Sequence, residues 1–268
     1  MLGLVLGGGG AKGYAHIGVL RILEEIGVRP DIIVGASMGS LVGGFYAAGF
    51  SSSKMEEIAS AIDKRKRKWL LKFNLSRRGL ISGKNIISFL TPYFGKKKIE
   101  DFSVKYAAIA TDIENNCEII IDKGDLIQAV RSSISIPVAF IPNQYAGRVL
   151  IDGGFPNPVP ITAAQKLGAT RIIAVNVWTR IPYGQVPLSV QPPSGKRYNV
   201  KQVFEKTFDY IATKLIDHEM LQLKNGMLIE VDTKDIEMYH FEKAKEAISL
   251  GYLEAKRQQE NIKRIALC

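Results

Sequence analysis

Apolar residues fall in short blocks along the chain, separated by glycine, proline and charged residues. Near the amino terminus, the apolar run 2–6 leads into a glycine-rich segment and then into residues with helical periodicity that end near Gly27. A second strand is expected at 31–34, where the apolar run 32–34 follows Asp31. A strand, a helix and another strand in this order favour a parallel sheet with a crossover helix. The opening segment therefore predicts an α/β fold.

Strand and helix patterns continue to alternate through the rest of the chain. The basic stretch 64–98 has little clear period, so we expect short helices and loops that cover the site, with breaks at Gly79 and Gly83. The stretch 181–197 is rich in proline, glycine and serine and predicts a surface loop. Further strands are expected at 106–110, 118–121, 149–151, 171–177 and 227–231, and further helices at 40–48, from 54, from 126, at 161–167, at 200–223 and from about 241.

Composition limits the class of protein. Hydrophobic residues make up 46% of the chain and charged residues 23%, as in ordinary globular proteins. The two cysteines form no metal or redox spacing, and no uncharged apolar stretch approaches the roughly 18 residues of a membrane span. The amino terminus has no basic region ahead of its apolar run, so we expect a first strand and a cytoplasmic protein. No repeat or boundary is evident, which predicts one domain over 1–268, with a motif-bearing core at about 2–178 and a helical part at about 200–268.

The net charge of +10 is unevenly distributed. Five consecutive basic residues at 64–68 form a basic cluster. One interpretation of this cluster is a solvated helix face, and the other is a surface that is attracted to anionic phosphates. Trp69, Leu70 and Phe73 follow the cluster closely, and apolar residues among charges favour a membrane interface over DNA. No zinc-finger spacing or RNA-recognition motif supports a nucleic-acid partner. Peripheral contact with the inner face of the membrane is therefore expected of Lys64, Arg65, Lys66, Arg67 and Lys68.

The second predicted strand ends in Gly35-Ala36-Ser37-Met38-Gly39. A strand, a sharp turn and a helix form the context that a G-x-S-x-G nucleophile elbow requires. Gly35 and Gly39 would let strand and helix approach, and the helix would direct the positive end of its dipole at the turn. The alternative is an ordinary strand-to-helix turn capped by Ser37.

The glycine-rich segment 7–13 offers a second element of a site. Gly8, Gly10 and Gly13 match the spacing of a dinucleotide fingerprint, which also needs an acidic residue at the end of the second strand. Asp31 lies at the wrong end of that strand, which disfavours this interpretation. A loop of this kind also directs bare backbone N–H groups at an anion, such as the oxyanion of an acyl intermediate.

A serine nucleophile needs a base. His16 falls on the first helix as an expected packing residue, and His218 and His240 lie in polar helical surroundings without a loop motif. Asp152 is a better candidate, because an apolar strand delivers it into Gly153 and Gly154. Asp-Gly is also a common turn, but burial beside apolar residues would raise the pKa of the carboxylate and strengthen it as a base. A Ser-Asp dyad is chemically reasonable.

Four segments together resemble the patatin-like phospholipase family in its compact bacterial form. They occur in the family's order, and the resemblance spans roughly residues 2–178. They are GGGGAKGYAHIGVL at 7–20, GASMG at 35–39, AVRSSISIPVAFIP at 129–142 and DGGFPNPVP at 152–160.

The resemblance implies a three-layer α/β/α fold with a mostly parallel central sheet, related to acyl-carrier-protein transacylases. It implies Ser37 as nucleophile, Asp152 as base, and an oxyanion hole from the backbone of Gly8, Gly9 and Gly10, with no metal or cofactor required. Lys12 stands where the family has Arg or Lys, and either supports the loop or meets a lipid phosphate. Gly7 stands where plant members carry Asp, at a position that is not catalytic. The remaining glycines that carry the motifs are Gly13, Gly35, Gly39, Gly153 and Gly154.

We therefore expect a serine acyl hydrolase that cleaves fatty-acyl esters of lipids through an acyl-enzyme. An acyltransferase with the same dyad is one alternative, and a dinucleotide-binding or regulatory protein with an inert Ser37 is another. Chain-length and headgroup specificity and oligomeric state are not encoded in these motifs.

Overall fold

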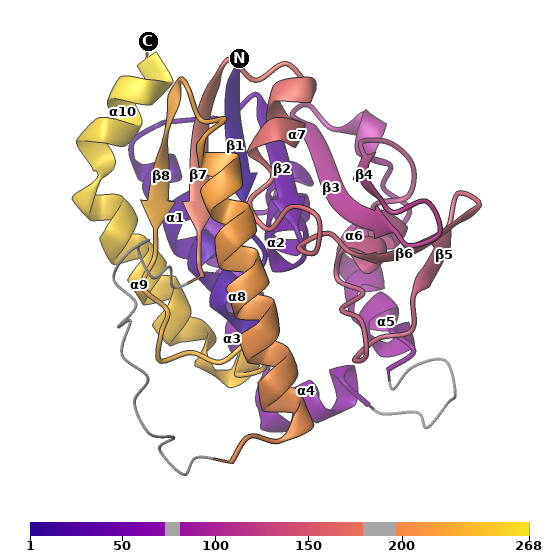
Figure 1. Ribbon diagram of the computed structural model, residues 1–268. Coiled ribbons are helices and arrows are strands. Elements are labelled where there is room, and N and C mark those ends of the chain that lie inside the picture. Colours follow the sequence, from indigo (N-terminus) through magenta and orange to yellow (C-terminus); the bar gives the residue numbers. More distant parts are fainter. Residues whose placement is uncertain (73–80, 179–196, 268) are drawn as a thin grey trace, which may run out of the picture.

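The computed structural model describes residues 1–72, 81–178 and 197–267. Within these residues, eight strands form one sheet of order β5-β6-β3-β2-β1-β7-β8, and β4 pairs with β3 (Figure 1). Residues 73–80 of the basic stretch and nearly all of the loop expected at 181–197 lie outside the described residues. The strands are β1 (Leu2–Leu6), β2 (Ile32–Ala36), β3 (Lys105–Asp112), β4 (Cys117–Ile121), β5 (Asn143–Tyr145), β6 (Arg148–Asp152), β7 (Arg171–Asn176) and β8 (Gly226–Glu230).

The centre of the sheet is parallel. Strand β1 pairs in parallel with β2 on one side and β7 on the other, and the parallel order extends to β3 and β8. Strands β4, β5 and β6 pair antiparallel at the β3 end. The hairpin between β5 and β6 turns through Ala146 and Gly147, which both have positive φ. The sequence pattern did not predict β5, because three residues are too few to show an alternation.

Helices cover both faces of the sheet, which confirms the predicted α/β/α class (Figure 1). Leu4 and Leu6 of β1 belong to one hydrophobic core, and Val5 between them belongs to the other. The second core includes α7 (Ile161–Lys166) and α8 (Val200–Met220). The first includes α1 (Ala15–Glu25), α2 (Met38–Ala47), α3 (Ser52–Ser60), α5 (Lys84–Phe94), α6 (Leu126–Ser133), α9 (Ala244–Arg257) and α10 (Gln259–Leu267).

The carboxyl-terminal segment forms two helices, α9 and α10, after a short 3₁₀ turn at Phe241–Lys243, where the pattern predicted one helix. Helix α9 packs closely on α1 through two glycines. A Cβ on Gly18 would lie 2.0 Å from the Ile248 carbonyl oxygen, and one on Gly251 would lie 1.9 Å from that of Ala15. Helix α9, near the carboxyl terminus, is thus held in close backbone contact with α1, the first helix of the chain.

The stretch 64–98 contains the short helices that its sequence predicted. Helix α4 (Lys64–Leu70) begins at Asp63, whose side chain accepts a hydrogen bond of 2.7 Å from the Lys66 N–H. Helix α5 follows after Gly83, and another 3₁₀ turn lies at Ile99–Asp101. None of the helices in the described ranges is long and apolar enough to cross a membrane.

Candidate active site

Ser37 occupies a strained turn between β2 and α2. Its φ of 51° and ψ of −123° lie in a region that side-chain-bearing residues rarely adopt. A Cβ on Gly35 would lie 2.4 Å from backbone atoms of Gly39, and one on Gly39 would lie 2.0 Å from the Leu6 carbonyl oxygen. Only glycine fits on either side, so the geometry is that of a nucleophile elbow.

Neighbouring side chains hold the elbow in place. The Ser37 N–H donates a hydrogen bond of 2.9 Å to Ser133 Oγ, and Ser40 Oγ donates one of 2.7 Å to the Ser37 carbonyl. Gly13 makes room for Met38, the residue after Ser37, since a Cβ there would lie 2.4 Å from Met38 Cγ. The Ser37 side chain is therefore presented by a fixed backbone at the start of α2.

Asp152 lies at the end of β6, and its backbone is anchored to the same segment as Ser37. Its N–H donates to the Ser135 carbonyl at 3.0 Å, and the Gly153 N–H donates to the Ser133 carbonyl at 3.2 Å. A Cβ on Gly153 would lie 2.0 Å from the Ile109 carbonyl oxygen. Sequence reasoning assigned Ser133 no role, yet its hydroxyl and its carbonyl contact the two motifs that carry Ser37 and Asp152.

A buried arginine supports that segment from the other side. Arg131 is 2% exposed; its guanidinium donates to Ser135 Oγ and, at 2.8 Å, to the Ile141 carbonyl. Burial lowers the pKa of Arg131 to about 10, which leaves it charged at neutral pH. A Cβ on Gly83 would lie 2.0 Å from Arg131 Nε, so glycine there admits the guanidinium.

The carboxylate of Asp152 has the environment of a base. Its Oδ1 accepts a hydrogen bond of 2.7 Å from the Gly154 N–H, while the buried Oδ2 has no hydrogen-bond partner in the described part of the chain. Burial raises the pKa of Asp152 to about 7, against smaller opposing effects of the Ser37 hydroxyl and the Gly154 N–H. The carboxyl group thus interacts with the Ser37 hydroxyl and has an affinity for a proton near neutrality.

The glycine loop packs directly on the elbow. Gly9 and Gly10 have φ of 152° and 56°, and a Cβ on Gly8 would lie 3.3 Å from that of Ser37. The Gly8 N–H already donates to the Pro158 carbonyl at 2.9 Å, and the Ala11 N–H donates to that of Met238 at 2.8 Å. The N–H groups of Gly9 and Gly10 make no backbone hydrogen bond to the described residues. Of the three expected oxyanion donors, two thus have no backbone acceptor among the described residues, and the third supports the loop.

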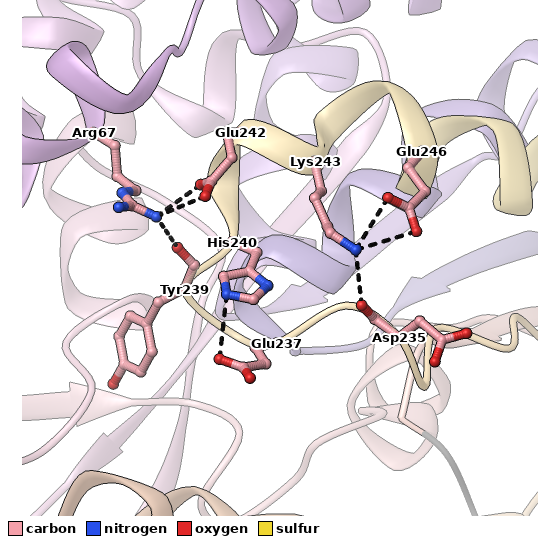
Figure 2. A network of polar contacts seen from close by, with 8 residues as sticks. All are labelled: Arg67, Asp235, Glu237, Tyr239, His240, Glu242, Lys243 and Glu246. Atoms are coloured by element: carbon pink, nitrogen blue, oxygen red, sulfur yellow. Dashed lines mark hydrogen bonds and ion pairs between the residues drawn. The ribbon is translucent and has the colours of Figure 1, made fainter.

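None of the three histidines is among the residues that line the pocket at Ser37. His16 is buried, and its Nε2 lies 2.7 Å from the Gly7 carbonyl oxygen. Burial lowers the pKa of His16 to about 4, so a neutral imidazole donates to the glycine loop. His218 is exposed on α8, and His240 Nε2 lies 3.3 Å from Glu237 (Figure 2).

An apolar pocket opens beside Ser37. It has a volume of about 90 Å³ and is lined by residues from α2, α4, α5 and the segment 238–241. A second cavity, of about 40 Å³, continues toward α3 and shares Tyr14, Met38, Leu41, Ile62 and Phe89 with the first. The prediction that the stretch 64–98 covers the site is thus confirmed for its described part.

Lys12 is nearly buried beside the glycine loop. Its ammonium lies 5.1 Å from the centroid of the Trp178 ring, a cation–π distance.

In the described ranges, no group of three or more His, Cys, Asp or Glu side chains could hold a metal ion.

Comparison with known proteins gives the family. A sequence model described as patatin-like phospholipase matches residues 4–164. The chain belongs to the patatin-like phospholipase family. It is 36% identical over 179 residues to lysophospholipase NTE1 of Debaryomyces hansenii, a match that covers 66% of this chain and 12% of the fungal protein.

A bacterial family member resembles the chain to a similar degree. An uncharacterized NTE family protein of Mycobacterium bovis is 36% identical over 177 residues, covering 65% of this chain and 48% of that protein. The chain therefore spans less than half of either relative. Among solved structures, VipD from Legionella pneumophila aligns over 97% of this chain and 66% of its own, with 14% identity and a TM-score of 0.48.

Proposed function

We propose that this patatin-like protein hydrolyses fatty-acyl esters of lipids through a Ser37–Asp152 dyad. The observation that carries the proposal is the pairing of a serine on a strained elbow with a buried carboxylate whose pKa is about 7. Family membership and the name of the fungal lysophospholipase support a lipid substrate. The apolar pocket beside Ser37 suits an acyl chain.

In the first half of the proposed reaction, Asp152 Oδ2 takes the proton of the Ser37 hydroxyl as Oγ attacks the ester carbonyl carbon. The N–H groups of Gly9 and Gly10 stabilise the oxyanion, because no backbone acceptor in the described part of the chain competes for them. The ester C–O bond then breaks, and the protonated Asp152 gives its proton to the leaving alcohol. An acyl group remains on Ser37.

In the second half, water attacks the acyl carbonyl while Asp152 accepts a proton from it. The Ser37–acyl bond breaks, Asp152 returns the proton to Ser37 Oγ, and a fatty acid is released. Transfer to an alcohol acceptor in place of water would follow the same steps, so product analysis with candidate alcohols separates a hydrolase from a transferase.

The dyad is tested by two substitutions and a covalent probe. Ser37→Ala and Asp152→Asn should each lower ester hydrolysis by at least about a thousandfold, because a serine nucleophile without its base is weak. A fluorophosphonate should label the wild type and the exposed-serine control Ser60→Ala, and should leave Ser37→Ala unlabelled. Full hydrolysis by either dyad variant would refute the mechanism.

We also propose that α4 contacts an anionic membrane surface. Lys64, Arg65 and Lys68 are exposed there, and the Trp69 ring on the same helix is 43% exposed. No residue of α4 is buried. Cationic side chains beside an exposed indole suit an anionic interface, and this surface covers the pocket that contains Ser37.

A further inference from the structure

The pocket beside Ser37 contains a single charged side chain among its described lining residues. That residue is Arg67, which α4 places against apolar neighbours such as Leu70 and Phe89. Its side chain is 26% exposed, so the guanidinium lies between the apolar pocket and solvent. The acyl group of a lipid ester needs no cation, and the proposed dyad does not use Arg67.

Among the described residues, Arg67 makes its polar contacts through one nitrogen, Nη1. Nη1 lies 2.7 and 3.0 Å from the two carboxylate oxygens of Glu242 and 3.4 Å from the Tyr239 carbonyl oxygen (Figure 2). Within the described residues, Nη2 and Nε donate no hydrogen bond. The Nε–Nη2 edge is therefore available as a planar pair of donors.

A guanidinium edge matches a phosphate, which accepts two parallel hydrogen bonds. The other basic residues of α4, including Lys64, Arg65 and Lys68, keep the surroundings cationic although Glu242 neutralises Arg67 itself. A monoacyl phospholipid carries a phosphate and an acyl ester in one molecule. We propose that Arg67 binds the phosphate of such a lipid headgroup while its acyl chain occupies the pocket at Ser37. This inference rests on the proposed function and adds to it a residue that recognises the headgroup.

The competing explanation is that Arg67 only fastens α4 to the segment 239–242. A substrate pair separates the two explanations: decanoyl-lysophosphatidic acid and monodecanoylglycerol share their acyl chain and ester and differ in the phosphate. Both are used below their critical micelle concentrations, so that surface attraction does not contribute. The quantity compared is the ratio of kcat/KM for the phosphate ester to kcat/KM for the neutral ester.

Arg67→Gln should lower this ratio by about tenfold or more, because hydrogen bonds to charged groups are strong. Arg67→Lys should give an intermediate ratio, since it keeps the charge and loses the planar edge. Glu242→Gln removes the same ion pair between α4 and the segment 239–242. It should keep or raise the ratio of kcat/KM values, because it frees Nη1 of Arg67. Arg21→Gln removes a comparably exposed Arg–Glu pair between α1 and α3 and is the matched control.

Equal losses on both substrates in Arg67→Gln and Glu242→Gln would show a fastening role only and would overturn the proposal. If the wild type hydrolyses neither ester, the proposed function fails, and the headgroup site is still tested by calorimetry with a non-hydrolysable decyl ether analogue of the phospholipid. The Kd should then rise about tenfold in Arg67→Gln. An unchanged Kd, or inorganic phosphate binding as tightly as the ether lipid, would overturn the assignment to a lipid headgroup.

Discussion

The Ser37 turn and the glycines packed against it form what we call the floor of the Ser37 pocket, and α4 forms its cover. These two regions are built in opposite ways. On the floor, Gly35, Gly39 and Gly153 lie so close to other backbone that a Cβ would come within 2.4 Å of it. In the cover, α4 has no buried residue, and polar contacts such as Arg67–Glu242 hold it to the rest of the molecule. Backbone packing therefore sets the position of the nucleophile, while a few side chains set the position of the cover.

This contrast assigns different tasks to the two regions. Chemistry at an ester requires the nucleophile, base and oxyanion donors to be positioned within a fraction of an ångström, which rigid backbone provides. Entry of a lipid requires a wall that can give way, and a helix with exposed charges and few buried contacts opens at low free-energy cost. We expect changes in the floor to act on the rate of the reaction, and changes in the cover to act on which substrate and surface the protein uses.

Among changes that leave both dyad side chains in place, the largest effect is expected for Gly39→Ala. The new Cβ would lie 2.0 Å from the Leu6 carbonyl oxygen and 2.6 Å from that of Gly7, and neither backbone can retreat without moving β1 or the glycine loop. Esterase activity should fall at least about a hundredfold, since misplacing reacting groups by about 1 Å costs that much. Thermal unfolding should show a loss of several kcal/mol, typical of overpacking against backbone.

Gly44→Ala is the matched control for Gly39→Ala, since it lies in the same helix. Its Cβ would have side-chain contacts of 3.3–3.4 Å, which small rotamer changes accommodate. Retention of full activity and stability by Gly39→Ala would contradict the idea of a backbone-fixed floor.

The pH dependence tests the floor through its base. Asp152 must be ionised to accept the Ser37 proton, so with a pKa of about 7, kcat/KM should rise as pH increases through 7 and then level off. The folded form also holds a proton on Asp152 that the unfolded chain, with a pKa of about 3.9, has already lost. The free energy of unfolding should therefore fall between about pH 4 and pH 7 on account of this group.

Asp152→Asn removes this effect and should be more stable than the wild type at pH 8, by at least about 1 kcal/mol, while inactive. Asp112→Asn is the comparison of opposite sign. Hydrogen bonds from Asn115 and Arg148 lower the pKa of the Asp112 carboxyl to about 2, so its stabilising effect is present at neutral pH and is lost as the pH falls from about 4 toward 2. Denaturant unfolding across pH measures both variants. Equal stability of Asp152→Asn and wild type at pH 8 would argue against a strained, ionised carboxylate.

The floor could be predicted from the sequence far better than the cover. Strand β1, the glycine loop, α1, β2 and the Ser37 turn follow one another within residues 2–37, and each leaves a local pattern. The hydrogen bond from the Ser37 N–H to Ser133 Oγ spans 96 positions of sequence. The Gly8 N–H likewise donates to the carbonyl of the distant Pro158. No local pattern encodes such pairings, so the acceptor of the Gly8 N–H and the contacts of Ser133 required the three-dimensional structure.

The same limit explains what the sequence missed in the cover. The basic run at 64–68 was visible, but its five members share one chemistry and look alike in sequence. Folding separates them, because Arg67 turns toward Glu242 and the pocket while Lys64, Arg65 and Lys68 remain exposed. Arg67 differs from its neighbours because it contacts Glu242, which lies 175 positions away in the sequence.

The smallest effect on catalysis is expected from neutralising the exposed charges of the cover. In Lys64→Gln/Arg65→Gln/Lys68→Gln, partitioning onto vesicles rich in phosphatidylglycerol should weaken by about a hundredfold at low salt, because each basic residue near an anionic bilayer contributes about 1 kcal/mol. The difference should shrink at 0.5 M salt, where these charges are screened. Cosedimentation measures the partitioning, and fluorescence of exposed Trp69 reports insertion against the buried Trp178. A triple variant of the exposed residues Lys105, Lys123 and Lys256 removes the same charge elsewhere and should bind like the wild type. If both triple variants weaken equally, net charge alone draws the protein to the membrane, and α4 has no special place in that contact.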